Sequence, residues 1–184
     1  ESDLQRTSEL LYDWSNGQAA LGNVTLYHDG ERWNDAHIRV YASNRLRPNA
    51  SQGGIVGDWI SDTQVMSITY SAGQVWMGAV WNRYGESNGT LGEDWPRTLA
   101  HELGHYLLYL DDNYIGFDAA GRLAPVTACP GVMTDQYSAD KASGYDEFHV
   151  DAGWMPGCKW TLSQEGVARS DWATIHVMYP WLTT

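Results

Sequence analysis

Residues 94–112, DWPRTLAHELGHYLLYLDD, decide how this chain of 184 residues is interpreted. The stretch opens with an aspartate suited to a helix N-cap, followed by a proline in the first turn, where proline is tolerated. The residues up to Tyr109 are rich in Leu and contain no further proline, so they predict a helix. His101 and His105 lie four positions apart in it and therefore share one face.

The five residues HELGH, 101–105, predict metal-dependent hydrolysis. Two imidazoles on one helix face can bind a single metal ion, and Glu102 projects close to that face without being a ligand. Zinc lowers the pKa of a bound water towards about 7 and polarises a carbonyl group. The motif therefore predicts His101 and His105 as Zn²⁺ ligands and Glu102 as the general base that activates the water.

A catalytic zinc ion usually has three protein ligands, so a third must follow the helix. Asp111 is the first candidate, six residues after His105. In a continuous helix, however, Asp111 would lie about 15 Å along the axis from His101, too far to share an ion. The chain must therefore turn back at the end of the helix, and Asp112 is the nearest alternative ligand.

The spacing resembles the metzincin signature, HExxHxxGxxH or HExxHxxGxxD, and the aspartate form is similar to the snapalysin-like small secreted bacterial proteases. The resemblance implies that His101, His105 and Asp111 bind zinc and that Glu102 is the general base. Leu108 stands where the family has the glycine that turns the chain. Because glycine accepts backbone angles that strain a bulky residue, this departure weakens the case for Asp111 or implies a turn one residue later.

A second motif, CPGVMTD at 129–135, carries a strong Pro-Gly turn signal. Metzincins have a tight turn whose methionine packs below the zinc-binding histidines, and the resemblance implies this role for Met133. An ordinary core-filling methionine is the alternative. Some members place a tyrosine after this turn to hydrogen-bond the oxyanion. Tyr137 is the candidate, although it follows Met133 by four residues rather than two.

The remaining segments predict an α+β fold in one domain covering 1–184. The predicted elements are a helix at 3–14, strands at 23–28, 37–43, 54–60, 65–70 and 74–82, and a helix from Ser170 to Met178. The resemblance implies a metzincin-like zincin domain, with a twisted mixed sheet, an active-site helix, a Met-turn and a C-terminal helix. In that family one strand edges the cleft and pairs with extended substrate, and we expect the strand 74–82 there because its glycines permit close backbone approach.

The composition excludes several classes of protein. A formal net charge of -12 and a pI near 4.6 argue against binding nucleic acid through its phosphates. No run of 18 apolar residues is present, so we expect no membrane insertion. We expect a monomer that acts on a protein or peptide substrate.

Cys129 and Cys158 are the only cysteines. They form either a disulfide or two buried thiols, and the acidic, lysine-poor composition favours a secreted protein with the disulfide. Closing that loop would stabilise the fold by roughly 3–4 kcal/mol.

Two other functions compete with a zinc endopeptidase. The ten tryptophans spread over the chain would suit a carbohydrate- or cell-wall-binding module if they were exposed, although core filling explains them more simply. A catalytically inactive metal-binding protein is the other alternative, and the presence of Glu102 argues against it. The complete HExxH motif therefore favours the active protease.

Two further metal arrangements are open. Glu147 or His149 could supply a distant third zinc ligand, although both suit a polar loop or helix face. The acidic residues after the helix, Asp111, Asp112 and Asp118, lack the spacing of an EF-hand, and a Ca²⁺ site elsewhere is an alternative for a secreted acidic protein.

Overall fold

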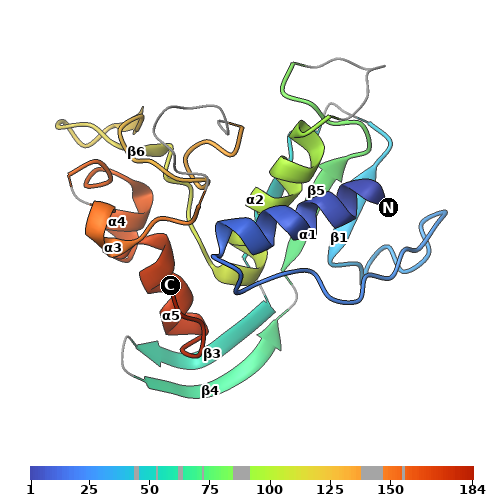
Figure 1. The fold of residues 1–184 in the computed structure, drawn as a ribbon, viewed down its shortest axis with the longest axis horizontal. Helices are drawn as coiled ribbons and strands as arrows, with labels where there is room; N and C mark the ends of the chain where they lie inside the picture. Colours follow the sequence, from blue (N-terminus) through green and yellow to red (C-terminus); the bar gives the residue numbers. More distant parts are fainter. Residues whose placement is uncertain are drawn as a thin grey trace.

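The computed structural model describes residues 1–43, 46–52, 54–61, 64–71, 73–84, 92–137, 147–154 and 156–184. The described chain is an α+β fold with a mixed sheet, as predicted. Helix α2 (Asp94–Leu108) lies in the middle of the fold (Figure 1). The N-terminal helix and the main sheet lie on one side of it, and the C-terminal segments lie on the other.

Helix α1 (Ser2–Trp14) covers one side of α2. Its apolar stripe follows the helical period, and its buried residues are Thr7, Leu10, Leu11 and Trp14. The Thr7 hydroxyl donates to the carbonyl of Asp3 at 2.7 Å and lies 3.4 Å from the carbonyl of Pro96 in the first turn of α2. The start of α2, the helix that carries the HELGH motif, is therefore held against α1.

The main sheet has the strand order β1 (Ile38–Tyr41), β5 (Gln74–Gly78) and β2 (Asn49–Ser51). β5 pairs parallel with β1 and antiparallel with β2. The expectation that 74–82 forms the strand at the cleft edge is wrong, because β5 is central, with a neighbour on each side, and ends at Gly78. The short edge strand β2 lies there instead, because its residues Asn49 and Ala50 line the cleft that contains His101, Glu102 and His105.

Strands β3 (Gly54–Ser61) and β4 (Gln64–Ser71) form a separate antiparallel pair, close to their predicted positions. The pair curves away from the main sheet and passes beneath helix α5 (Figure 1). The predicted strand at 23–28 is absent, and those residues have no regular secondary structure. β-propensity alone does not make a strand where no partner strand runs alongside.

The C-terminal segment contains the hairpin of β6 (Ile115–Phe117) and β7 (Leu123–Pro125), followed by α3 (Asp151–Trp154), α4 (Leu162–Gly166) and α5 (Asp171–Met178). Helix α5 agrees with its sequence signals, because the hydroxyl of the N-cap residue Ser170 accepts a hydrogen bond from the amide of Ala173 at 3.1 Å.

The core is built around α2. Its fully buried side chains come from every layer of the fold and include Trp14, Val75, Met77, Leu99, Leu103, Met133, Phe148 and Trp172. Within the described residues, no helix is both long and apolar enough to cross a membrane.

Four tryptophans are buried in the interior. Trp14, Trp95 and Trp172 belong to this core, and Trp154 belongs to a smaller cluster with Cys129 and Cys158. Among the tryptophan side chains that the structure describes, only Trp160 and Trp181 are exposed, at 43% and 65%. This distribution favours core packing over a row of aromatic platforms for sugar rings.

Candidate metal centre

Helix α2 brings the two histidines together. The Nε2 atoms of His101 and His105 lie 3.2 Å apart, and both residues line a cleft of about 400 Å³. His101 is 3% exposed because α2 is buried along most of its length. The predicted pairing of these two side chains on one helix face is therefore present.

The chain turns back immediately after α2. The helix ends at Leu108, and Tyr109 adopts the left-handed conformation with φ 62° and ψ 25°. The amide of Leu110 donates to the carbonyl of Gly104 at 3.3 Å, which closes the end of the helix. The turn therefore lies at Tyr109, one residue after Leu108, which occupies the position of the signature's glycine. A turn one residue later is one of the two possibilities that the sequence leaves open.

Asp112, and not Asp111, joins the histidines. One carboxylate oxygen of Asp112 lies 3.1 Å from Nε2 of His101 and 3.2 Å from Nε2 of His105. In the part of the chain that the structure describes, these three residues are the only group of His, Cys, Asp and Glu side chains arranged to hold a metal ion. Asp111, the residue expected here, is not part of this group: the chain turns one residue later than expected, so the next carboxylate along the chain faces the histidines.

Asp111 lines the wall of the cleft instead. Its carboxylate accepts a hydrogen bond of 3.4 Å from the side-chain amide of Gln52, next to β2. Gln52 also reaches the carbonyl of Tyr109 at 3.3 Å, so it joins the turn to the edge of the sheet.

Both histidines are oriented by backbone carbonyls. Nδ1 of His101 lies 3.0 Å from the carbonyl of Val132, and Nδ1 of His105 lies 2.6 Å from that of Leu110. Since a carbonyl only accepts hydrogen bonds, each Nδ1 carries the proton. Nε2 is therefore the nitrogen of each ring that faces the Asp112 carboxylate, as a hydrogen-bond donor when it is protonated and as a metal ligand when it is not.

Without a metal ion, Asp112 and His105 stabilise each other's charged forms. Burial opposes the charge of Asp112, but hydrogen bonds from His101 and His105 outweigh it and hold the pKa of Asp112 well below its usual range. Burial likewise lowers the pKa of His105, but the hydrogen bond and charge of Asp112 dominate and raise it to about 9. A proton thus occupies the place that a metal ion would take.

Glu102 lies beside the group without belonging to it. It is 6% exposed and lines the same cleft as His101 and His105. Burial raises the pKa of Glu102, and the charges of the two histidines oppose that shift. A buried carboxylate with a raised pKa, next to a metal group, is suited to accepting and returning a proton.

The segment that carries Met133 lies directly beneath the histidines. Met133 is fully buried, and a Cβ atom added to Gly104 of α2 would lie 3.0 Å from its sulfur. The carbonyl of Met133 accepts a hydrogen bond of 2.9 Å from the amide of Asn113. Two neighbouring residues therefore make three contacts with the site. The Val132 carbonyl orients His101, and the Met133 side chain packs against α2. The Met133 carbonyl binds the amide of Asn113, the residue after Asp112.

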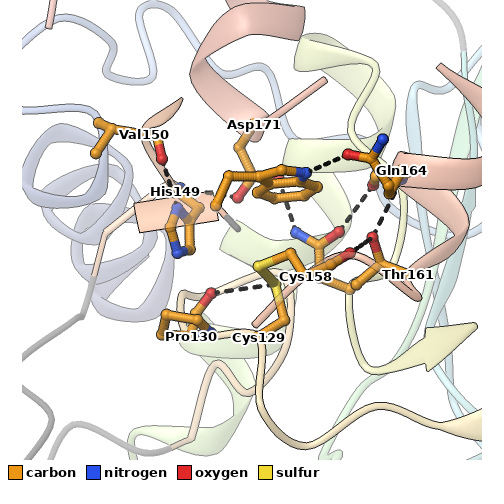
Figure 2. Close-up of a disulfide and its surroundings, with 11 residues drawn as sticks. Cys129, Pro130, His149, Val150, Cys158, Thr161, Gln164 and Asp171 are labelled. Carbon is orange, nitrogen blue, oxygen red and sulfur yellow. Dashed lines mark hydrogen bonds between the residues drawn. A yellow bond between two sulfur atoms is a disulfide. The ribbon is translucent and has the colours of Figure 1, made fainter. Parts of the chain in front are cut away.

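The predicted disulfide is present between Cys129 and Cys158, with the Cα atoms 4.4 Å apart. Figure 2 shows this bond near His149, Gln164 and Asp171, where the C-terminal helices meet the segment that contains Cys129 and Pro130. The disulfide joins the segment beneath the metal group to the chain between α3 and α4.

A buried polar network behind Asp112 could not be found from the sequence. Asn113, fully buried, donates from Nδ2 to Asp171 at 2.8 Å and accepts at Oδ1 from the Ser163 hydroxyl at 2.8 Å. Asp171 also accepts from the amide of His149 at 2.9 Å, and burial raises its pKa to about 6. In sequence, Asp171 resembles an ordinary first-turn acid after a serine N-cap, so nothing signals the long-range pairing.

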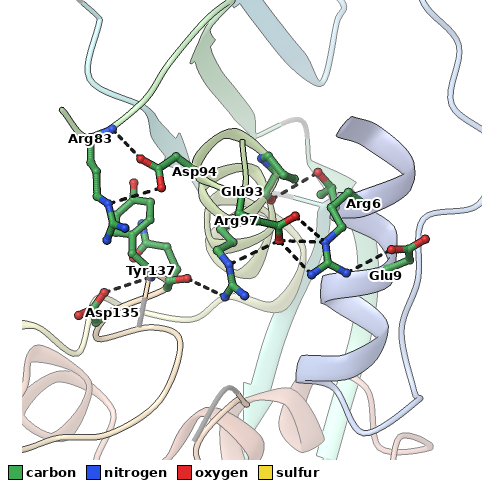
Figure 3. Close-up of polar contacts among 11 residues, drawn as sticks. Arg6, Glu9, Arg83, Glu93, Asp94, Arg97, Asp135 and Tyr137 are labelled. Carbon is green, nitrogen blue, oxygen red and sulfur yellow. Dashed lines mark hydrogen bonds and ion pairs between the residues drawn. The ribbon is translucent and has the colours of Figure 1, made fainter. Parts of the chain in front are cut away.

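Tyr137 does not take the place expected for it. Its hydroxyl lies 2.7 Å from that of Thr98, and its ring packs 4.7 Å from the Arg83 guanidinium. Figure 3 shows Tyr137 and Arg83 near the start of α2, and Tyr137 does not line the cleft. Tyr114 lines it instead, where burial, then the charge and hydrogen bond of Asp112, raise its pKa.

The other candidate ligands lie outside the group. His149 is buried, and its Nδ1 lies 2.8 Å from the carbonyl of Val150. Glu147 contributes its backbone carbonyl to the amide of Val132 at 3.2 Å. Asp118 forms an ion pair of 2.8 Å with Arg122, so its carboxylate is already used.

A comparison of the chain with protein-family models, with curated proteins and with solved structures finds no match, so the functional argument rests on the geometry of the site.

Proposed function

We propose that the chain is a secreted zinc-dependent endopeptidase with a metzincin-like fold. The observation that carries the proposal is the convergence of His101, His105 and Asp112, with buried Glu102 beside them in an open cleft. Two imidazoles, one carboxylate and an adjacent carboxylic acid are a donor set typical of catalytic zinc sites. The disulfide suits an oxidising compartment.

The proposal assigns a role to the three residues of the metal group, to Glu102 and to the two residues whose carbonyls orient the histidines. His101, His105 and Asp112 hold the ion, which supplies Lewis acidity towards water and a peptide carbonyl. Glu102 takes a proton from water at its carboxylate and delivers it to the leaving amine. Val132 and Leu110 keep the histidines in the tautomer that presents Nε2.

The edge of the sheet supports a peptide as the substrate. β2 pairs with β5 along one side, and its residues Asn49 and Ala50 line the cleft. An extended peptide can add to such an edge through main-chain hydrogen bonds. That placement would carry a scissile bond past Glu102 and the metal group.

Metal content and peptide cleavage together test the proposal. We expect about one zinc per chain after purification without added metal, retained in Asp111→Asn and lost in Asp112→Ala. Glu102→Gln should retain zinc and lose about 10²–10⁴-fold in kcat.

Asp111→Asn is the matched control, because Asp111 borders the cleft but not the metal group. Absence of zinc from the parent protein, even after reconstitution, would refute the proposal. Zinc binding without cleavage of any protein or peptide would leave a metal-binding protein instead.

A further inference from the structure

Arg47 is the only arginine or lysine among the described residues that line the metal cleft. Around it lie the acidic residues Glu102, Asp111 and Asp112, together with the two histidines. The whole chain has a formal charge of -12, so a positive charge at this position stands out.

The backbone around Arg47 is well fixed. The side-chain amide of Asn49 donates to the carbonyl of Arg47 at 2.9 Å, and the intervening Pro48 is buried. β2 begins at Asn49, so Arg47 lies two residues before the strand edge that lines the cleft. Its own side chain is exposed there.

Arg47 also differs in its contacts from four other arginines that the structure describes. Arg6, Arg83, Arg97 and Arg122 each form an ion pair with a carboxylate. Among the described residues, the Arg47 guanidinium forms neither a hydrogen bond nor an ion pair. Arg47 lines the same cleft as Glu102, His101 and His105, so its guanidinium is available to a ligand bound there.

We infer that Arg47 is a substrate-binding residue that receives a carboxylate of the bound peptide beside the metal group. This inference rests on the proposed function and assigns part of its specificity. A guanidinium offers two parallel N–H donors that match a carboxylate, and such charge-assisted pairs are the strong ones. The carboxylate is either an acidic side chain or the peptide C-terminus.

Binding to the zinc-loaded Glu102→Gln variant tests the inference without turnover. Four N-acetylated fluorescent peptides of otherwise identical sequence would carry Glu or Gln near the centre and a free or amidated C-terminus. Anisotropy should give a Kd about 10- to 100-fold lower for peptides with the recognised carboxylate. In Glu102→Gln/Arg47→Gln this ratio should fall to about one, within the error of the titration.

Arg122→Gln in the same background is the matched control, because Arg122 is exposed on the β6–β7 hairpin, and the ratio should persist. A Glu-dependent ratio identifies a side chain, whereas a ratio that depends on amidation identifies the C-terminus. Equal Kd values for all four peptides, or a ratio unchanged by Arg47→Gln, overturn the inference. Failure of the proposed function is seen separately, as absence of cleavage by the parent enzyme.

Discussion

At the scale of single residues, the ring orientations of His101 and His105 are fixed by the contacts of Nδ1, the nitrogen of each ring that faces away from Asp112. Each Nδ1 is already used by a carbonyl oxygen, at 3.0 Å for His101 and 2.6 Å for His105. Neither ring can therefore rotate to offer another nitrogen without losing a buried hydrogen bond. The Nε2 atoms instead face the Asp112 carboxylate, at 3.1 Å for His101 and 3.2 Å for His105.

This arrangement predicts unusual titration of His105 in the metal-free protein. NMR of the imidazole should give a pKa near 9, raised by Asp112 from the ordinary value of 6.5. Because the raised value belongs to the folded state, the stabilisation it provides is complete below pH 6.5 and is lost as the pH rises through 9. Zinc must displace this proton, so its affinity should increase with pH below that value.

Asp112→Asn serves as the control for that titration. Without the carboxylate, burial remains and lowers the pKa of His105, so its titration should move to the ordinary value or below. A pKa below 7 for His105 in the metal-free parent would contradict the prediction.

At the scale of elements, the end of α2 determines which carboxylate reaches the histidines. Tyr109 has φ 62°, which costs a residue with a Cβ atom about 1–2 kcal/mol relative to a right-handed conformation. The cost is met here because the turn places Leu110 against both His105 and Gly104. The position of the turn, more than the motif, selects Asp112.

Substitutions at Tyr109 test this dependence. Tyr109→Gly accepts the positive φ and should retain one zinc per chain, whereas Tyr109→Pro, with φ fixed near −65°, should lose zinc binding. Metal content by mass spectrometry and far-UV circular dichroism should be measured on both variants. Full zinc occupancy in a folded Tyr109→Pro protein would show that the turn does not position Asp112.

The same turn marks the limit of what the sequence could predict. The HExxH spacing predicts that His101 and His105 meet, because a helix has a fixed period. The residue that turns left-handed is not signalled, since neither Leu108 nor Tyr109 favours that conformation. The pairing of Asn113 with Asp171 and the order of the strands depend on contacts between distant segments, which no local pattern records.

At the scale of the whole molecule, the disulfide joins the site to the C-terminal third of the chain. Cys129 and Cys158 are separated by 29 residues, and a loop of that size predicts roughly 3–4 kcal/mol of stabilisation. The Cys129→Ala/Cys158→Ala variant should therefore unfold at lower denaturant concentration. It should also bind zinc more weakly, because Val132 and Met133 belong to the tethered segment.

Denaturant unfolding with and without a reducing agent measures this contribution. The parent should lose stability on reduction, and the double-alanine variant should be insensitive to the reducing agent. An identical unfolding midpoint for the parent in both conditions would show that the bond contributes nothing to stability.

The contacts of Asn113 have a consequence for biosynthesis. Asn113 directly follows Asp112, yet its partners Ser163 and Asp171 lie 50 and 58 residues further along the chain. While the ribosome is still making residues 163–171, the turn at Tyr109 can already form, but the Asn113 side chain does not yet have these two partners. The polar network behind the proposed ligand Asp112 can therefore close only after Asp171 has been made, and we expect tight metal binding no earlier than that step.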